Sequence, residues 1–162
     1  TKKRTVPPGA VFLFAVLFTI LSVSDKSIKK GESMSKINIF SLGGLNENGK
    51  NMYVVEIDKD IFVLDAGLKY ADDRMLGVDY IIPNFDYIKN NIKRIKGLFI
   101  THGHDSQMGA IPDIIKEVPE LEIYGTDFTI EIIKKELEDE GLSSKHLHVI
   151  KPNRLFCCCQ FY

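Results

Sequence analysis

Alternating apolar and polar positions predict a series of short strands from Lys36 onward. Successive side chains of a strand face opposite sides of a sheet, so an apolar residue at every second position indicates one buried face. Such runs, or short continuous apolar runs, occur at residues 37–42, 51–57, 61–64, 98–101, 121–124 and 146–150. Turn residues at 46–49 and 58–60 separate the first three runs, which therefore predict a β-meander.

Helical spacing occurs between the later strands. One helix is indicated by apolar residues at three- or four-residue intervals, namely Phe85, Ile88, Ile92 and Ile95. Gly97 is the expected end of this helix, and further helices are expected over 111–118 and about 127–140. Residues 71–83 have no period and are expected to be irregular. Strands that alternate with helices after a meander predict an α/β layered domain.

The first 33 residues differ from this pattern. Basic residues at 2–4 precede an apolar run at 10–23, which resembles a secretory signal, or a membrane anchor that is short of the ~20 residues of a spanning helix. In the competing interpretation, residues 1–33 are translated upstream sequence and the natural start is Met34. Codons for Lys29-Lys30-Gly31-Glu32 can spell a purine-rich ribosome-binding tract, and the nucleotide sequence tests this hypothesis.

We therefore expect a domain over 34–154, with 1–33 as a non-domain extension and 155–162 as an aberrant tail without periodicity. The three cysteines are adjacent, at 157–159, and match neither a disulfide framework nor a zinc knuckle. Apolar residues make up 44% and charged residues 27%, which is the range of soluble globular proteins. The net charge of −1 gives no reason to expect a polyanionic partner, so RNA would need a local patch.

One basic cluster could provide such a patch. It lies on the polar side of the helix predicted near 85–95 and consists of Lys89, Lys93, Arg94 and Lys96. A charged helix face is usually a solvated face, and this is the favoured interpretation, with an RNA-facing patch as the alternative.

Two histidines follow the strand predicted at 98–101. His102 and His104 are two positions apart, so their imidazoles can point at one ion. In zinc hydrolases, neutral imidazoles hold the metal and an open position holds a water whose pKa falls to about 7. His146 and His148 alternate along a predicted strand without a partner motif, and we interpret them as ordinary strand residues.

An ordered set of segments resembles the ribonuclease J family of the metallo-β-lactamase fold. The segments are 41–45 (SLGGL), 47–56 (ENGKNMYVVE), 62–68 (FVLDAGL), 73–79 (DRMLGVD), 82–83 (IP), 96–104 (KGLFITHGH), 108–112 (MGAIP) and 124–126 (YGT). The resemblance runs from about Lys36 to Asn153. It implies an αβ/βα sandwich, of which this chain would supply only the N-terminal half.

The resemblance also implies a function. Family members are two-metal ribonucleases, acting as 5′-to-3′ exonucleases and as endonucleases in bacterial RNA maturation and decay. By position, His102 and His104 match ligands of the first metal. Asp65, at the end of the strand at 61–64, matches an acidic residue expected to support the site rather than to bind the metal directly. The implied cofactor is zinc, with one or two divalent ions, and the implied partner is RNA, not DNA.

The family pattern His-x-His-x-Asp-His is incomplete here. Ser106 stands where the pattern has Asp, Gln107 stands where it has His, and Asp105 falls one residue too early. A serine hydroxyl stays protonated and is a poor ligand, and a neutral amide oxygen replaces an imidazole, so both changes weaken the second metal site. No catalytic residue is assigned, and the third ligand of the first metal and the later Asp and His ligands would lie beyond residue 162.

The residues leave three hypotheses open. The first is a cytoplasmic ribonuclease J paralogue with an eroded metal motif and weak or no activity, acting as a homo-oligomer or in a hetero-complex with an intact paralogue. The second is an active metal-dependent hydrolase that uses Asp105 and Gln107 in a rearranged site. The third is a membrane-anchored or secreted protein of the same fold, in which residues 10–23 act as a membrane anchor or a secretory signal.

Overall fold

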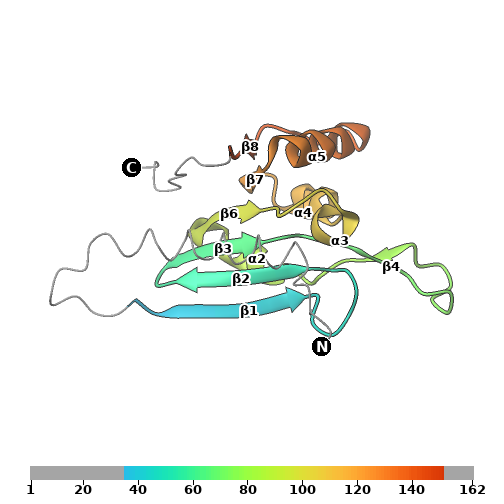
Figure 1. Ribbon diagram of the computed structural model, residues 1–162, viewed down its shortest axis with the longest axis horizontal. Helices are drawn as coiled ribbons and strands as arrows, with labels where there is room; N and C mark the ends of the chain where they lie inside the picture. The colour runs from blue at the N-terminus through green and yellow to red at the C-terminus, as the bar shows by residue number, and fades with distance from the viewer. Residues whose placement is uncertain (1–34, 152–162) are drawn as a thin grey trace, which may run out of the picture. The chain divides into compact units, whose positions relative to one another are not determined.

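The computed structural model describes residues 35–151 (Figure 1). The chain divides into two units between Ser35 and Lys36, and the described residues belong almost entirely to the second. The predicted extension at 1–33, its apolar run at 10–23 and the predicted tail at 155–162 lie outside the described residues. Within 35–151, no helix combines the length and the apolar character needed to cross a bilayer.

A six-stranded mixed sheet forms the centre of the described domain (Figure 1). Its strands are β1 (Ile37–Gly43), β2 (Met52–Ile57), β3 (Asp60–Leu64), β6 (Ile95–Phe99), β7 (Ile123–Gly125) and β8 (Leu147–Val149), and they lie side by side in that order. The first three strands pair antiparallel, which confirms the predicted meander, and β3, β6, β7 and β8 run parallel. The carboxyl ends of four neighbouring strands therefore meet at one edge of the sheet.

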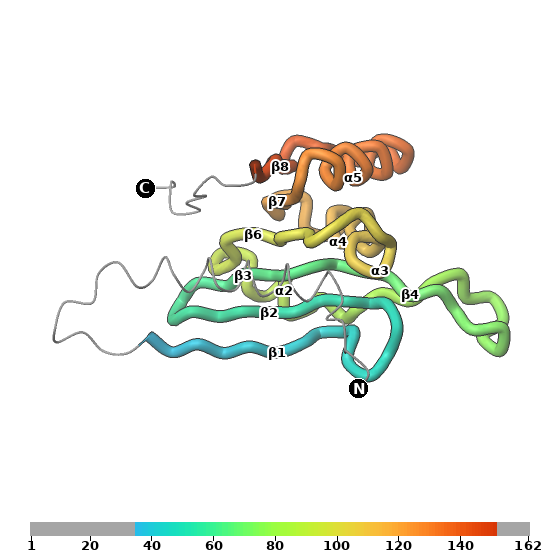
Figure 2. Tube along the Cα trace, viewed as in Figure 1, coloured from blue at the N-terminus to red at the C-terminus, as the bar shows by residue number. Residues whose placement is uncertain are grey.

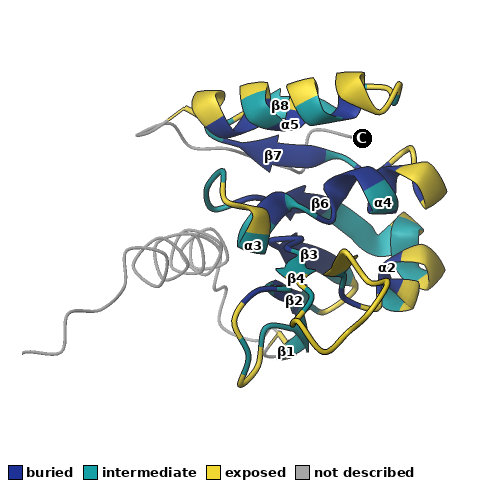
Figure 3. Cartoon of the chain, turned by 90° about the vertical axis from the view of Figure 1, so that its right-hand side faces the viewer, coloured by how far each residue is buried: buried dark blue, intermediate teal, exposed yellow. Residues whose placement is uncertain are grey.

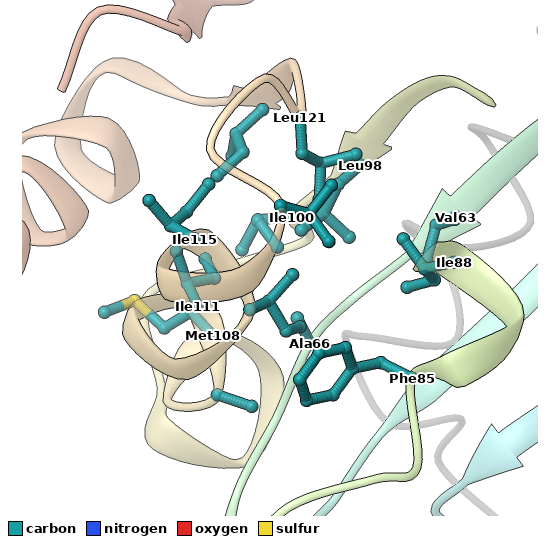
Figure 4. Close-up of a cluster of buried hydrophobic side chains, with 14 of the residues drawn as sticks. Val63, Ala66, Phe85, Ile88, Leu98, Ile100, Met108, Ile111, Ile115 and Leu121 are labelled. Carbon is teal, nitrogen blue, oxygen red and sulfur yellow. The ribbon is translucent and has the colours of Figure 1, made fainter. Parts of the chain in front are cut away.

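Helices cover one face of this sheet (Figure 3). They are α2 (Asp86–Asn91), α4 (Ile111–Glu117) and α5 (Asp127–Asp139). One apolar core joins them to the strands, and Figure 4 shows part of it, with Val63 and Leu98 from the sheet facing Ile88 and Ile111 from the helices. The result is one helix layer on one sheet, which confirms the α/β class.

The chain between Phe85 and Gly97 corrects one prediction. Helix α2 ends at Asn91, a single 3₁₀ turn (η2) follows at Ile92–Arg94, and β6 begins at Ile95, where we expected helix. Ile95 instead pairs with Ile61 of β3. Gly97 lies within β6, where an added Cβ would approach the Tyr124 ring to 2.4 Å, so the glycine makes room for that ring and does not end a helix.

Two short strands, β4 (Lys69–Tyr70) and β5 (Tyr80–Ile81), pair with each other; β4 lies just before the segment expected to be irregular, and β5 lies within it. They form the base of an arm that extends beyond the end of the main sheet (Figure 2). A further short helix, α3 (Asp105–Met108), follows the histidines, and the sequence pattern did not predict it. Helices this short depend on tertiary contacts more than on periodicity.

The sheet face opposite the helices carries a row of rings. Phe99 stacks on Tyr124 with centroids 5.0 Å apart, and Tyr124 stacks on His148 at 4.8 Å. Phe62 lies at the other end, 6.2 Å from Phe99. Because these residues occupy neighbouring parallel strands, the pairing of β3, β6, β7 and β8 places their rings side by side.

Truncating a core residue of α5 should destabilise the domain far more than truncating an exposed residue of the same helix. Ile133 is fully buried, whereas Phe128 is 75% exposed. We expect Ile133→Ala to lower the free energy of unfolding by about 2–5 kcal/mol and Phe128→Ala to change it by less than about 0.5 kcal/mol, as measured by urea denaturation. Equal losses in the two variants would contradict this packing of α5.

Candidate metal centre

The candidate centre lies where parallel strands β3 and β6 end beside each other. The backbone N–H of Asp65 donates to the carbonyl of Phe99 at 2.9 Å and continues the pairing one residue past β3. Asp65 then turns with a φ of 61°, a left-handed conformation that is uncommon for residues other than glycine. This turn ends the strand at a buried position, since Asp65 is only 6% exposed.

Among residues 35–151, Thr101 alone donates hydrogen bonds to the Asp65 carboxylate. Its Oδ1 accepts hydrogen bonds from the Thr101 backbone N–H at 2.8 Å and from the Thr101 hydroxyl at 2.9 Å, and its Oδ2 lies 3.0 Å from the same hydroxyl. Burial raises the pKa of Asp65 to about 6, although the hydrogen bonds from Thr101 act in the opposite direction. The predicted supporting role of Asp65 toward a metal stays a prediction.

His102 and His104 come together as their spacing suggests. Their ring centroids lie 4.7 Å apart with the rings nearly perpendicular, at 89°. His102 is half-buried, and its Nδ1 lies 3.0 Å from the Thr101 hydroxyl, whereas His104 is exposed at the N-cap of α3. Burial, together with the neighbouring His104, lowers the pKa of His102, so its imidazole is neutral at pH 7 and keeps the lone pair that a metal needs.

Ser106 and Gln107 contact each other. The Ser106 hydroxyl donates to the Gln107 side-chain oxygen at 2.5 Å, so the amide oxygen that could bind a metal already accepts one hydrogen bond. A hydroxyl and an amide are weak ligands for a divalent transition metal beside carboxylate and imidazole. The two positions that the sequence predicts as eroded metal-ligand positions therefore carry side chains that hydrogen-bond to each other.

The backbone of α3 is fixed against residues 66–68. Ala66 N–H donates to the Gln107 carbonyl at 2.6 Å, and Leu68 N–H donates to the Asp105 carbonyl at 2.8 Å. A Cβ at Gly67 would lie 1.8 Å from the Ser106 carbonyl oxygen, so only glycine permits this approach. The Asn51 side-chain amide holds that same carbonyl oxygen at 2.9 Å.

The Asp105 carboxylate has a partner outside the histidine motif. It accepts a hydrogen bond from the Tyr70 hydroxyl at 2.5 Å, in a depression also lined by Tyr80, Asp113 and Glu136. The hydrogen bond to Asp105 raises the pKa of Tyr70. The rearranged site that would use Asp105 and Gln107 thus requires both side chains to leave their present partners.

Residues 35–151 contain no group of three or more His, Cys, Asp or Glu side chains arranged to hold a metal ion. His102 and His104 fit as two ligands of one ion, because they are adjacent and His102 is neutral. Ser106 and Gln107 do not fit a second ion. The adjacent cysteines at 157–159 lie outside the described residues.

His146 and His148 have a partner that the sequence pattern did not reveal. The Glu122 carboxylate contacts His146 Nδ1 through one oxygen, at 2.8 Å, and His148 Nε2 through the other. Burial acts to raise the pKa of Glu122, but the contacts with His148 and His146 lower it. His148 lies in β8 (Leu147–Val149) as predicted, whereas His146 directly precedes that strand, and the contact ties both to the residue before β7.

Comparison with known proteins identifies the class to which this fold and this strand-end centre belong. The chain is a member of the metallo-β-lactamase superfamily, whose family model matches residues 45–152. Membership implies the use of a divalent metal.

The similarity is specifically to ribonuclease J proteins, which confirms the resemblance found in the sequence. Ribonuclease J 2 of Staphylococcus saprophyticus is 42% identical over 109 residues, 67% of this chain and 19% of that protein. Ribonuclease J 1 of Streptococcus pyogenes is 41% identical over 108 residues, again 67% of this chain and 19% of that protein. The chain thus spans about a fifth of the length of these relatives, and identity does not separate the two paralogues.

Among solved structures, the short form of human tRNase Z matches with a TM-score of 0.45 and 18% identity. That match covers 72% of this chain and 44% of the tRNase Z chain.

The sequence pattern identifies the two histidines and Asp65, but not the residues that hydrogen-bond to them. In the sequence pattern, Thr101 is only the last residue of an apolar run. Its hydroxyl, directly before the first histidine, is the one local feature that could have indicated its contacts with Asp65 and His102. The contact of Gly67 with Ser106 and the bond from Tyr70 to Asp105 join residues more than 30 positions apart, and no local pattern reports them.

The raised pKa of Asp65 predicts a distinctive pH dependence of stability. A carboxyl with a higher pKa in the folded state takes up a proton on folding between pH 3.8 and about 6, so its contribution to stability is lost as the pH rises through that range. Relative to Asp65→Asn, the metal-free wild-type chain should lose up to about 3 kcal/mol between pH 4 and pH 7. Urea denaturation of both proteins across this range measures the difference, and a difference that does not vary with pH would refute the assignment.

Proposed function

We propose that this chain is a ribonuclease J-like protein of bacterial RNA processing and decay, with weak or no ribonuclease activity of its own. Its similarity to both ribonuclease J 1 and ribonuclease J 2 supports the family part of this proposal. The proposed loss of activity is supported by the hydrogen bond from Ser106 to Gln107, at 2.5 Å. The family pattern places metal ligands at these two positions.

His102 and His104, which match ligands of the first metal, support the proposal that one metal ion is still bound. His102 and His104 would hold one divalent ion, which we propose to be zinc, because imidazole nitrogens suit zinc. A zinc ion at such a site acts as a Lewis acid and lowers the pKa of bound water. The residues of this chain would position that ion, and the position of the second ion would stay empty or weakly bound.

RNA is the proposed partner, but not through the basic cluster of the α2 region. Lys89 pairs with Glu117 at 2.6 Å, Arg94 with Glu56 at 3.2 Å, and Lys96 with Asp60 at 3.3 Å. Exposed pairs like these contribute little to stability, but they neutralise the charge that would attract phosphate. This favours the solvated-face interpretation, so an RNA contact would use another surface.

With weak or no activity of its own, this chain would act as part of an assembly. We therefore propose a homo-oligomer, or a cytoplasmic hetero-complex in which an intact ribonuclease J paralogue supplies the chemistry. This chain would then contribute RNA-binding surface or assembly contacts. We do not propose DNA as a partner.

Metal titration distinguishes the eroded centre from the rearranged active centre. Zinc added to the full-length protein, followed by calorimetry, should bind as a single ion that His102→Ala removes. Introducing the ligands of the family pattern with Ser106→Asp and Gln107→His should add a second ion and should increase zinc- or manganese-stimulated cleavage of RNA.

The control is Ser143→Asp, which adds the same charge at an exposed position remote in sequence from the centre. It should change neither the number of bound ions nor the cleavage rate. Two tightly bound ions in the wild-type chain, with metal-stimulated RNA cleavage, would reject the eroded centre and favour the rearranged site that uses Asp105 and Gln107.

A further inference from the structure

Thr101 lies between the buried carboxylate and the first histidine of the motif. Its hydroxyl oxygen is 2.9 Å and 3.0 Å from the two oxygens of Asp65 and 3.0 Å from Nδ1 of His102. The Thr101 backbone N–H also donates to Asp65, which fixes the residue from a second direction. The hydroxyl is therefore held in place by contacts independent of His102.

The number of protons on these groups limits how they can be arranged. A hydroxyl has one proton to donate and two lone pairs to accept with, and an ionised carboxylate can only accept. With Asp65 ionised, the single proton of Thr101 is donated to the carboxylate. The hydroxyl oxygen can then only accept from His102, so the proton of the neutral imidazole lies on Nδ1.

We propose that Thr101 is a positioning residue that selects the tautomer of His102. Its hydroxyl, oriented by Asp65, accepts the Nδ1–H of His102 and leaves the lone pair of Nε2 as the one that binds the metal. Which nitrogen of a histidine binds a metal is set by the hydrogen bond of the other nitrogen, and partners of this kind typically change metal affinity 10–100-fold.

This inference rests on the proposed first-metal site, but its first measurement needs no metal. The positions of imidazole protons are read from nitrogen chemical shifts of the metal-free chain labelled with ¹⁵N-histidine. The measurement is made at pH 8, where Asp65, with its pKa of about 6, is ionised. We expect His102 to carry its proton on Nδ1 in the wild-type chain and in Thr101→Ser, and to lose this preference in Thr101→Val.

The second measurement is zinc affinity by calorimetry. Thr101→Val should weaken zinc binding about 10–100-fold, whereas Thr101→Ser, which keeps the hydroxyl, should stay within about threefold of wild type. The matched control is Thr126→Val. Thr126 follows β7 as Thr101 follows β6, but its hydroxyl contacts Thr129 at 2.9 Å, so neither the tautomer nor the affinity should change.

The outcomes separate this inference from the proposed function. A His102 proton on Nε2 in the wild-type chain, or on Nδ1 in Thr101→Val with unchanged zinc affinity, overturns the role of Thr101. An Nδ1 proton that depends on the hydroxyl, in a chain that binds no zinc, supports the tautomer assignment and rejects the metal site of the proposed function. If Thr101→Val does not fold, the wild-type and Thr101→Ser spectra still decide the tautomer.

Discussion

The parallel pairing of β3 with β6 is the constraint on which the candidate centre depends. Leu64 lies opposite Phe99 in that pairing, so Asp65, one residue past β3, and Thr101, two residues past β6, lie beside each other at the end of the sheet. The buried carboxylate of Asp65 needs hydrogen-bond donors, and Thr101 supplies both its backbone N–H and its hydroxyl. These hydrogen bonds satisfy the buried carboxylate at the end of the sheet. His102, the first histidine of the motif, directly follows Thr101.

A second set of contacts fixes helix α3, which comes directly after the histidines. Helix α3 is too short to be stable alone, but the backbone of residues 66–68 hydrogen-bonds to the carbonyls of Asp105 and Gln107. Gly67 allows this close approach, and Asn51 holds the carbonyl between them. The backbone of residues 105–107 is therefore held in one position, whichever side chains these residues carry.

The hydrogen bond between Ser106 and Gln107 has a chemical consequence. Ser106 and Gln107 satisfy each other through one hydrogen bond, so their polar atoms are not left unpaired beside the histidines. Neither of these two side chains is a carboxylate, so neither needs a cation to balance its charge. This agrees with the proposal that the chain acts in an assembly with weak or no activity of its own.

The sequence by itself determined the family, the meander and the pair of histidines. Apolar alternation at 51–57 and 61–64 is a local property, and the order of the motif segments needs no coordinates. The tertiary structure alone decided four features. It ended α2 early, because Ile95 is needed to pair with Ile61. It joined Tyr70 to Asp105 and Glu122 to two histidines of the β8 segment. It also placed the Thr101 hydroxyl between Asp65 and His102, because strand neighbours 36 positions apart meet only when the sheet forms.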